Sequence, residues 1–205
     1  PASPPPVAPA APPASAPDPH GRATALLSKG RAAEAFEVTE QAIADGTDDA
    51  RIWLVRGDSL RALGRKEEAA ASYDQGLKRA PRDPQAWLKK GEALDAAGVY
   101  AEAAICYDKA LELHPRHIGA WNSKGVALTR LGRMEDALAC FTRALELDPR
   151  FALARFNRGA AEDVLGRAEA AVGSFEAFLS LATPSQRAQI QHAQKRLLIL
   201  KAPRT

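Results

Sequence analysis

Long hydrophobic runs are missing from this 205-residue chain. A typical short run, Leu197-Leu198-Ile199-Leu200, falls far below the roughly 20 residues that a membrane-spanning helix needs. We therefore expect no membrane insertion. The sequence also opens at Pro1 without an initiator methionine or an apolar leader, so we interpret it as a fragment or processed form.

A large charge of one sign is missing as well. The formal net charge is +3, and residues 185–205 hold five bases and no acid, so the rest of the chain is slightly acidic. A protein that binds a polyanion along its body needs a far larger positive excess. Nucleic acid is therefore not an expected partner.

Cysteine is scarce, with Cys106 and Cys140 lying 34 residues apart. If they occupy equivalent faces of neighbouring stacked helices, about 8–10 Å separates those helices, whereas a disulfide needs Cα atoms within about 7 Å. We expect two free thiols, which favours a reducing compartment and a cytoplasmic location.

The residue patterns of catalytic and metal sites do not stand out either. We find no Ser-His-Asp or Cys-His arrangement, phosphate-binding glycine loop or carboxylate pair, so we expect neither an enzyme nor a cofactor. His114 and His117 have a spacing that two metal ligands can use. Pro115 lies between them and no carboxylate or cysteine is near in sequence, so we expect no metal site.

What the chain has in plenty is proline and alanine at its start. Residues 1–19 carry a single charge, on Asp18, and few side chains that can pack, which predicts a disordered, extended linker. An alternative is a ligand for a proline-recognition groove, although no basic residue flanks the segment to orient such docking.

The dominant feature is a repeat with a period of 34 residues. Six columns keep the same residue type from unit to unit: tryptophan at 53, 87 and 121; glycine at 57, 91, 125 and 159; a second glycine at 64, 98, 132 and 166; alanine at 69, 103, 137 and 171; tyrosine or phenylalanine at 73, 107, 141 and 175; and proline at 81, 115 and 149.

These columns predict a helix, a tight turn and a second helix in every unit. Tryptophan and the first glycine lie four residues apart on one helix face, with the glycine leaving room for a neighbouring backbone. The second glycine suits the left-handed conformation that ends a helix. Alanine and the aromatic residue form one face of the second helix, which the proline ends. Such hairpins must stack to bury their apolar faces.

The segment Trp87-Leu88-Lys89-Lys90-Gly91, followed by Ala103, Tyr107, Ala110 and Pro115, resembles the tetratricopeptide repeat. The resemblance implies an all-α, right-handed solenoid of stacked helix-turn-helix hairpins. We predict full repeats at 50–83, 84–117, 118–151 and 152–185, and a degenerate N-terminal one at 20–49.

Some positions depart from the family pattern. The leucine usual before the first glycine is replaced in every unit by a base: Arg56, Lys90, Lys124 and Arg158. The fourth unit has Arg155 in the tryptophan column and Glu162 in a leucine column. We therefore expect this unit to pack less tightly.

A capping helix is predicted at 186–201. Thr183 and Pro184 suit its start, with Gln186 reaching back to the cap. Apolar residues then recur on one face, at Ile190, Ala193, Leu197 and Leu200. This helix should cover the last repeat and show a basic outer face.

In the family, the first helices of successive units line a concave groove that holds segments of partner proteins. Groove candidates are the residues that point away from the tryptophan and glycine face of each first helix. They are Arg51, Leu54, Asp58, Arg61, Leu88, Glu92, Asp95, Asn122, Val126, Thr129, Arg130, Phe156 and Asp163, with Gln85, Gly119, Leu153 and Ala160 at matching positions.

These candidates describe a partner segment of a particular kind. The aligned row of Leu54, Leu88, Val126 and Phe156 favours an apolar contact surface, although the same residues suit packing between helices. The acids among the candidates suggest a partner with some basic residues. The lysine and asparagine clamp of chaperone-binding relatives is absent from the matching positions.

The ladder of bases at 56, 90, 124 and 158 has two interpretations. It could track phosphates at one contact per repeat, but no stacking aromatics accompany it. We prefer the second interpretation, in which the aliphatic stems of these bases cover the apolar interior while their charged ends pair with acids such as Glu112, Glu146 and Asp148.

The sequence therefore predicts a scaffold or adaptor that binds another protein or peptide segment by complementarity. Two alternatives remain open. The repeats could self-associate through a weakly packed end, or they could be an accessory domain of a larger enzyme or signalling protein.

Overall fold

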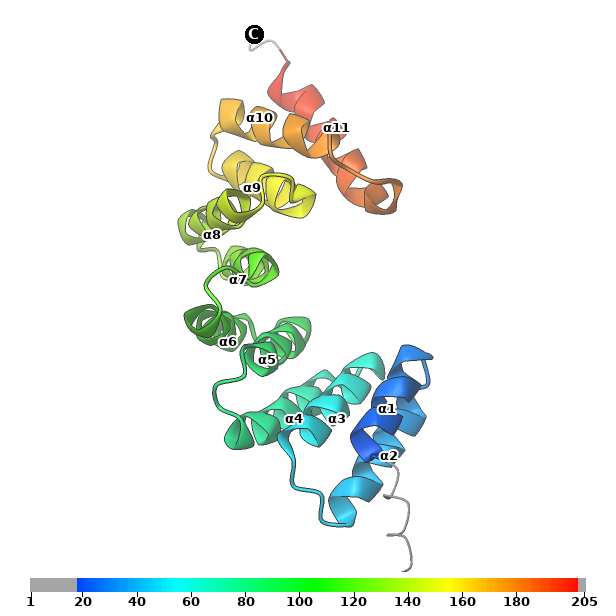
Figure 1. The fold of residues 1–205 in the computed structure, drawn as a ribbon. Helices are drawn as coiled ribbons and strands as arrows, with labels where there is room; N and C mark the ends of the chain where they lie inside the picture. The colour runs from blue at the N-terminus through cyan, green and yellow to red at the C-terminus, as the bar shows by residue number, and fades with distance from the viewer. Residues whose placement is uncertain (1–17, 203–205) are drawn as a thin grey trace, which may run out of the picture.

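The computed structural model describes residues 18–202, which form helices and turns without a strand (Figure 1). Its α-helices are α1 (Pro19–Ser28), α2 (Ala32–Ala44), α3 (Ala50–Ala62), α4 (Lys66–Arg79), α5 (Pro84–Ala96), α6 (Tyr100–Leu113), α7 (Ile118–Arg130), α8 (Met134–Leu147), α9 (Ala152–Val164), α10 (Ala168–Leu179) and α11 (Arg187–Leu200). The predicted linker lies outside the described residues, apart from Asp18 and Pro19. These two residues start α1, because the Asp18 carboxylate accepts hydrogen bonds from the His20 and Gly21 amides.

Consecutive helices pair into hairpins that stack along one curved axis (Figure 1). The predicted all-α solenoid of helix-turn-helix units is confirmed. Each unit from 50 to 185 contains one hairpin, from α3 with α4 to α9 with α10, and the segment 20–49 contains α1 and α2.

Local signals set where the helices begin and end. The carboxylates of Asp49 and Asp83 accept hydrogen bonds from the first amides of α3 and α5, and Nδ1 of His117 does the same for α7, at 3.0 Å from the Ala120 nitrogen. In the four full units the glycine that ends the first helix has φ between 72° and 84°. Side chains rarely adopt this conformation, so the glycine column is explained by backbone geometry.

The first glycine of each unit makes room for a ring rather than for a backbone, which corrects the prediction. A Cβ added to Gly57, Gly91 or Gly125 would lie 2.4–2.6 Å from an edge carbon of Tyr73, Tyr107 or Phe141. The rings stand on the helix surface that the missing Cβ leaves free, and they are almost completely buried. The aromatic column is therefore the centre of each hairpin.

The fourth unit keeps this arrangement in a looser form. A Cβ on Gly159 would lie 3.0 Å from Phe175, in line with the weaker packing predicted. Arg155 replaces a tryptophan, and its guanidinium donates to the Pro149 carbonyl at 2.6 and 3.0 Å. Trp87 and Trp121 make the matching bonds, at 2.9 Å, to the carbonyls of Pro81 and Pro115. The arginine therefore preserves the hydrogen bond that Trp87 and Trp121 make.

Helix α11 closes the C-terminal end of the stack. It follows a 3₁₀ turn, Pro184–Gln186, in which Oε1 of Gln186 accepts from the Thr183 amide at 3.0 Å, as predicted. Its predicted apolar face packs on Phe175 and Phe178 of α10. The expected basic outer face is only partly present, because Arg196 and Lys201 turn toward acids of α9 and α10.

The two cysteines are buried and unlinked, which confirms two free thiols. Burial raises the pKa of the Cys106 thiol to about 11 and also raises the pKa of the Cys140 thiol. Within residues 18–202, each helix is too short or too polar to cross a membrane.

Candidate partner-binding groove

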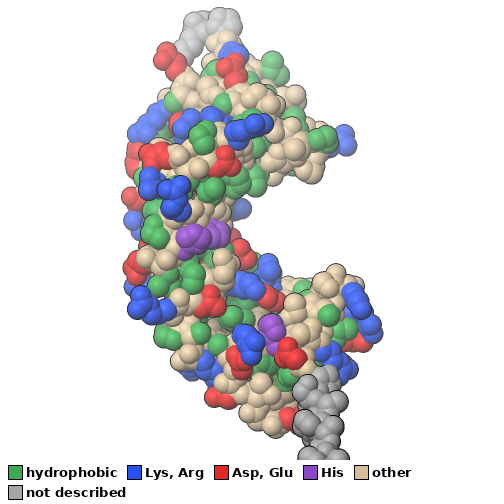
Figure 2. Space-filling model, viewed as in Figure 1, with side chains coloured by type: hydrophobic (Ala, Val, Ile, Leu, Met, Phe, Trp, Pro, Cys, Tyr) green, Lys and Arg blue, Asp and Glu red, His purple; other side chains and the backbone are tan. Residues whose placement is uncertain are grey.

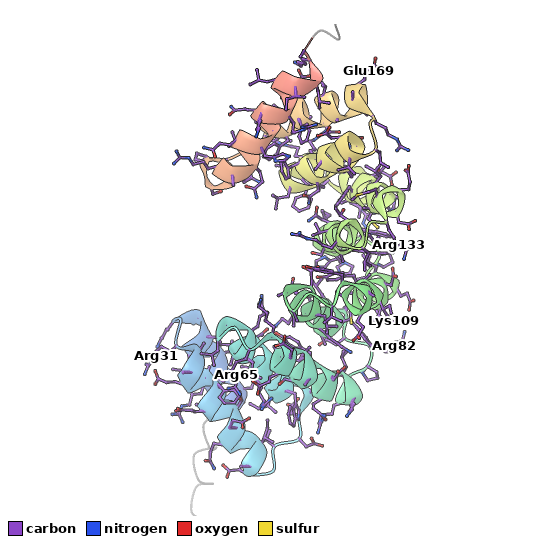
Figure 3. All side chains as sticks on the ribbon, turned by 180° about the vertical axis from the view of Figure 1, so that it is seen from behind. Arg31, Arg65, Arg82, Lys109, Arg133 and Glu169 are labelled. Carbon is purple, nitrogen blue, oxygen red and sulfur yellow. The ribbon has the colours of Figure 1, made fainter. Side chains whose placement is uncertain are left out.

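The stacked hairpins form an arc with a deep hollow on its inner side (Figures 1 and 2). Helices α3, α5, α7 and α9 face the hollow, and α4, α6, α8 and α10 form the outer layer (Figure 1). Seen from behind, Arg82, Lys109, Arg133 and Glu169 lie on the outer side of the arc (Figure 3). The inner layer of helices carries the candidate groove residues.

The apolar candidates pack within the chain. Leu54 lies against Gly76 of its own hairpin, and Leu88 is only 8% exposed. The Phe156 ring lies 5.2 Å from the Phe178 ring and 5.6 Å from the His192 ring of α11. Val126 is partly buried against the core cluster that includes Phe141 and Ala161. These side chains stabilise the hairpins, and a contact with a partner stays a prediction.

Polar candidates bridge α3 to α5. Asp58 accepts a hydrogen bond from the Tyr73 hydroxyl at 2.8 Å and forms an ion pair with Lys89 at 2.6 Å. Arg61 lies 3.6 Å from Glu92. Asp58 and Glu92, which we expected to be available to a basic partner, therefore already have bases of this chain beside them.

Similar bridges join the helices near the C-terminal end. The amide nitrogen of Asn157 in α9 donates to the side-chain oxygen of Asn122 in α7 at 2.9 Å. Arg196 of α11 donates to both carboxylate oxygens of Asp163 in α9, at 2.5 and 2.8 Å. Because α11 also contacts Phe156, it covers the groove positions of the fourth unit.

Asp95 of α5 is different. Its Oδ1 atom is buried and has no hydrogen-bond partner among residues 18–202, and desolvation raises the pKa of the carboxyl group while the charge of Arg130 in α7 opposes the shift. A desolvated carboxylate oxygen without a donor is costly. Asp95 and Asp163 occupy the same position two units apart. Asp163 accepts two hydrogen bonds from the guanidinium of Arg196, and Asp95 lacks such a donor.

The remaining candidates have local roles. Arg51 pairs with Asp49 at the start of α3, and the Thr129 hydroxyl donates to the Gly125 carbonyl at 2.9 Å. Arg130 is exposed at the end of α7. The helices α3, α5 and α7 that carry these candidates face the hollow, and their contact with a partner stays a prediction. Phe156 and Asp163 of α9 contact α11.

The ladder of bases has the structural role that we preferred, but with other acids than predicted. Arg56, Lys90 and Lys124 pair with Glu40, Asp74 and Asp108, at 2.5–2.6 Å, and each acid precedes its base by 16 residues. Each base also lies over the tryptophan ring of its own unit, at 5.6–5.7 Å from the ring centre. For Arg158, the residue 16 positions earlier is Thr142, which has no charge. Arg158 donates a hydrogen bond to Ser174 and lies 3.5 Å from Glu162 instead.

Sequence reasoning missed the bases that neutralise the groove acids. Lys89 of α5 lies 31 residues after its partner Asp58 of α3, and Glu92 lies 31 residues after Arg61. Arg196 lies 33 residues after Asp163. An offset slightly below the repeat period joins neighbouring first helices, so a search for opposite charges at this offset could have found the pairs.

Comparisons with known proteins agree with this geometry. Models of the tetratricopeptide repeat match residues 20–84, 54–118 and 119–151. No curated protein sequence matches the chain.

Solved structures with the same fold share little sequence with the chain. The crystal structure of MamA has a TM-score of 0.73 at 17% identity, over 84% of this chain and 96% of that one. MamA from Desulfovibrio magneticus RS-1 gives 0.76 at 20% identity, over 83% and 94%. YrrB, described as a tetratricopeptide protein with an unusual peptide-binding site, gives 0.74 at 20% identity, over 86% and 90%. The hairpin geometry, the repeated columns and the matching repeat models together show that this chain belongs to the tetratricopeptide repeat family.

Proposed function

We propose that this chain is a non-catalytic interaction module that holds a segment of a partner protein in the groove lined by α3, α5 and α7. The family consists of interaction modules, and YrrB, a protein of the same fold, has a peptide-binding site. Two buried free thiols support a reducing compartment such as the cytoplasm.

The observation that carries the proposal is the unpartnered oxygen of Asp95. Asp58, Glu92 and Asp163 have bases within 4 Å, whereas the structure of residues 18–202 gives Asp95 of α5 no ion pair and only the more distant charge of Arg130 in α7. An arginine of the partner would satisfy it as Arg196 satisfies Asp163. The partner segment is therefore expected to combine a basic residue with apolar neighbours.

The experiment is a selection of random helical peptides displayed against the full chain, followed by calorimetry. Peptides that bind the groove should carry a base, and Asp95→Asn should weaken their binding roughly tenfold, equivalent to about 1.4 kcal/mol. Replacing that base in the peptide by methionine should remove the difference between wild type and variant.

Asp58→Asn is the matched control, since Asp58 already has donors in Tyr73 and Lys89. It should change peptide affinity far less than Asp95→Asn. Equal affinities for wild type and Asp95→Asn, or selected peptides that lack bases, would contradict the proposed role of Asp95.

Self-association is a second candidate, favoured by the outer side of α11. Leu198 and Ile199 are 77% and 52% exposed at the end of the array. Sedimentation velocity over a range of concentrations tests this role, and a Leu198→Gln variant should shift the distribution toward monomer. A wild-type chain that stays monomeric would exclude it.

A further inference from the structure

The outer layer of the arc has a furrow between α6 and α8 that the proposed groove does not use. Its volume is about 570 Å³, and its walls include Ala101, Ala104 and Ile105 of α6 and Ala139 of α8. Residues of α7 and the following turn, among them Leu131, complete the lining. We call this cavity the outer furrow.

One column of the lining differs from the other full units. Ala101 stands where the other full units have Glu67, Glu135 and Glu169. At the next junction, Nη2 of Arg167 lies 2.7 Å from Oε1 of Glu135 and bridges successive units across the outer surface. One unit earlier, Arg133 corresponds to Arg167, and Ala101 stands in the place of the glutamate. Arg133 pairs with Asp136 of α8 instead. The salt bridge that crosses the neighbouring junction therefore has no counterpart here.

The same unit carries a larger aliphatic side chain in another outer column. Ile105 is 58% exposed and stands where the other units have alanine or glycine, at 71, 139 and 173. Leu131 on the opposite side is 39% exposed. Isolated exposed aliphatic residues are common, but here two of them flank one cavity. The ion pairs Lys124 with Asp108 and Arg133 with Asp136 lie in the same lining.

We propose that the outer furrow is a second docking site, for a protein segment that presents an aliphatic side chain next to a carboxylate. The aliphatic group would enter between Ala101, Ala104 and Ile105. The carboxylate would meet Arg133, as Glu135 meets Arg167 at the next junction. The site lies on the outer layer, so it can be occupied independently of the proposed groove.

Ala101→Glu provides the test, because it introduces the residue that three other units carry in this column. Random displayed peptides are selected on the full chain, and those that protect α6 and α8 from hydrogen exchange are measured by calorimetry. They should contain an aliphatic and an acidic residue. Their affinity should fall by roughly tenfold or more in Ala101→Glu, with the melting temperature unchanged.

Two further variants keep the test decisive. Ile105→Ala, which restores the residue of neighbouring units, should also weaken binding. Ala170→Glu adds the same charge at an exposed site of α10 and should leave the affinity unchanged. A selection that yields no peptide protecting α6 and α8, or only peptides insensitive to Ala101→Glu, would overturn the proposal. Loss of binding in Asp95→Asn alone would concern the groove and not the furrow.

Discussion

At the scale of the residue, the contact between glycine and ring is the feature on which each hairpin depends. The Gly125 and Phe141 pair is the closest of the four, with Cε1 of Phe141 only 2.4 Å from the place of a Cβ. Phe141 is 1% exposed and has little room to move. Gly125→Ala should therefore lower the free energy of unfolding by about 1–3 kcal/mol through overpacking, measured by urea denaturation.

Gly173 is the control for this prediction. It lies within α10, is exposed, and has no atom within 4 Å of an added Cβ. Gly173→Ala should stabilise the chain by about 0.5–1 kcal/mol, because alanine is the better helix former. Changes of opposite sign in the free energy of unfolding for the two variants would support the packing explanation, and equal changes would argue against it. Combining Gly125→Ala with Phe141→Leu should restore part of the lost stability.

At the scale of the element, α11 depends on a polar anchor as well as on its apolar face. The Asp163 side chain is 12% exposed and receives two hydrogen bonds from Arg196. Arg196→Ala would leave this carboxylate without its base, and should cost about 1 kcal/mol because the arginine itself is partly solvated. Hydrogen exchange should then become faster across α11 and at Asp163.

Lys195 is a suitable comparison, since it is exposed on the same helix. Lys195→Ala should change the free energy of unfolding by no more than about 0.5 kcal/mol. An Arg196→Ala protein with wild-type exchange in α11 would show that the apolar face alone holds the helix.

The helices and their order could be predicted from the sequence because each boundary has a local cause. The left-handed glycines, the prolines and the cap at Thr183 act on their own neighbours in the chain, and the period repeats the signal several times. The solenoid and its capping helix follow from these signals.

Contacts between elements were harder to predict. The period indicates that positions 56, 90 and 124 are equivalent and carry a base. It does not indicate which acid of a neighbouring helix lies beside each base. The true partners, Glu40, Asp74 and Asp108, lie one hairpin back and were missed. The partial closure of the groove by α11 was missed for the same reason, since it depends on the angle at which α11 crosses the stack.

At the scale of the whole molecule, each unit contacts mainly its neighbours, and the arc presents two separate surfaces (Figures 1 and 2). Among the described residues, polar bridges on the inner surface join α3 to α5, α7 to α9 and α9 to α11, whereas Oδ1 of Asp95 in α5 has no hydrogen-bond partner. The outer one has the furrow between α6 and α8, beside Ala101. Asp95 and Ala101 both belong to the unit 84–117, so this unit takes part in both proposed binding sites.

Hydrogen exchange of the full chain, with and without a selected base-containing peptide, tests the role of the groove most directly. Protection should concentrate on the inner helices α3, α5 and α7, and it should fall several-fold in Asp95→Asn at a peptide concentration near the wild-type Kd. Protection confined to α4, α6, α8 or α10 would contradict binding of the partner in the groove, and unchanged protection in Asp95→Asn would contradict the role of Asp95.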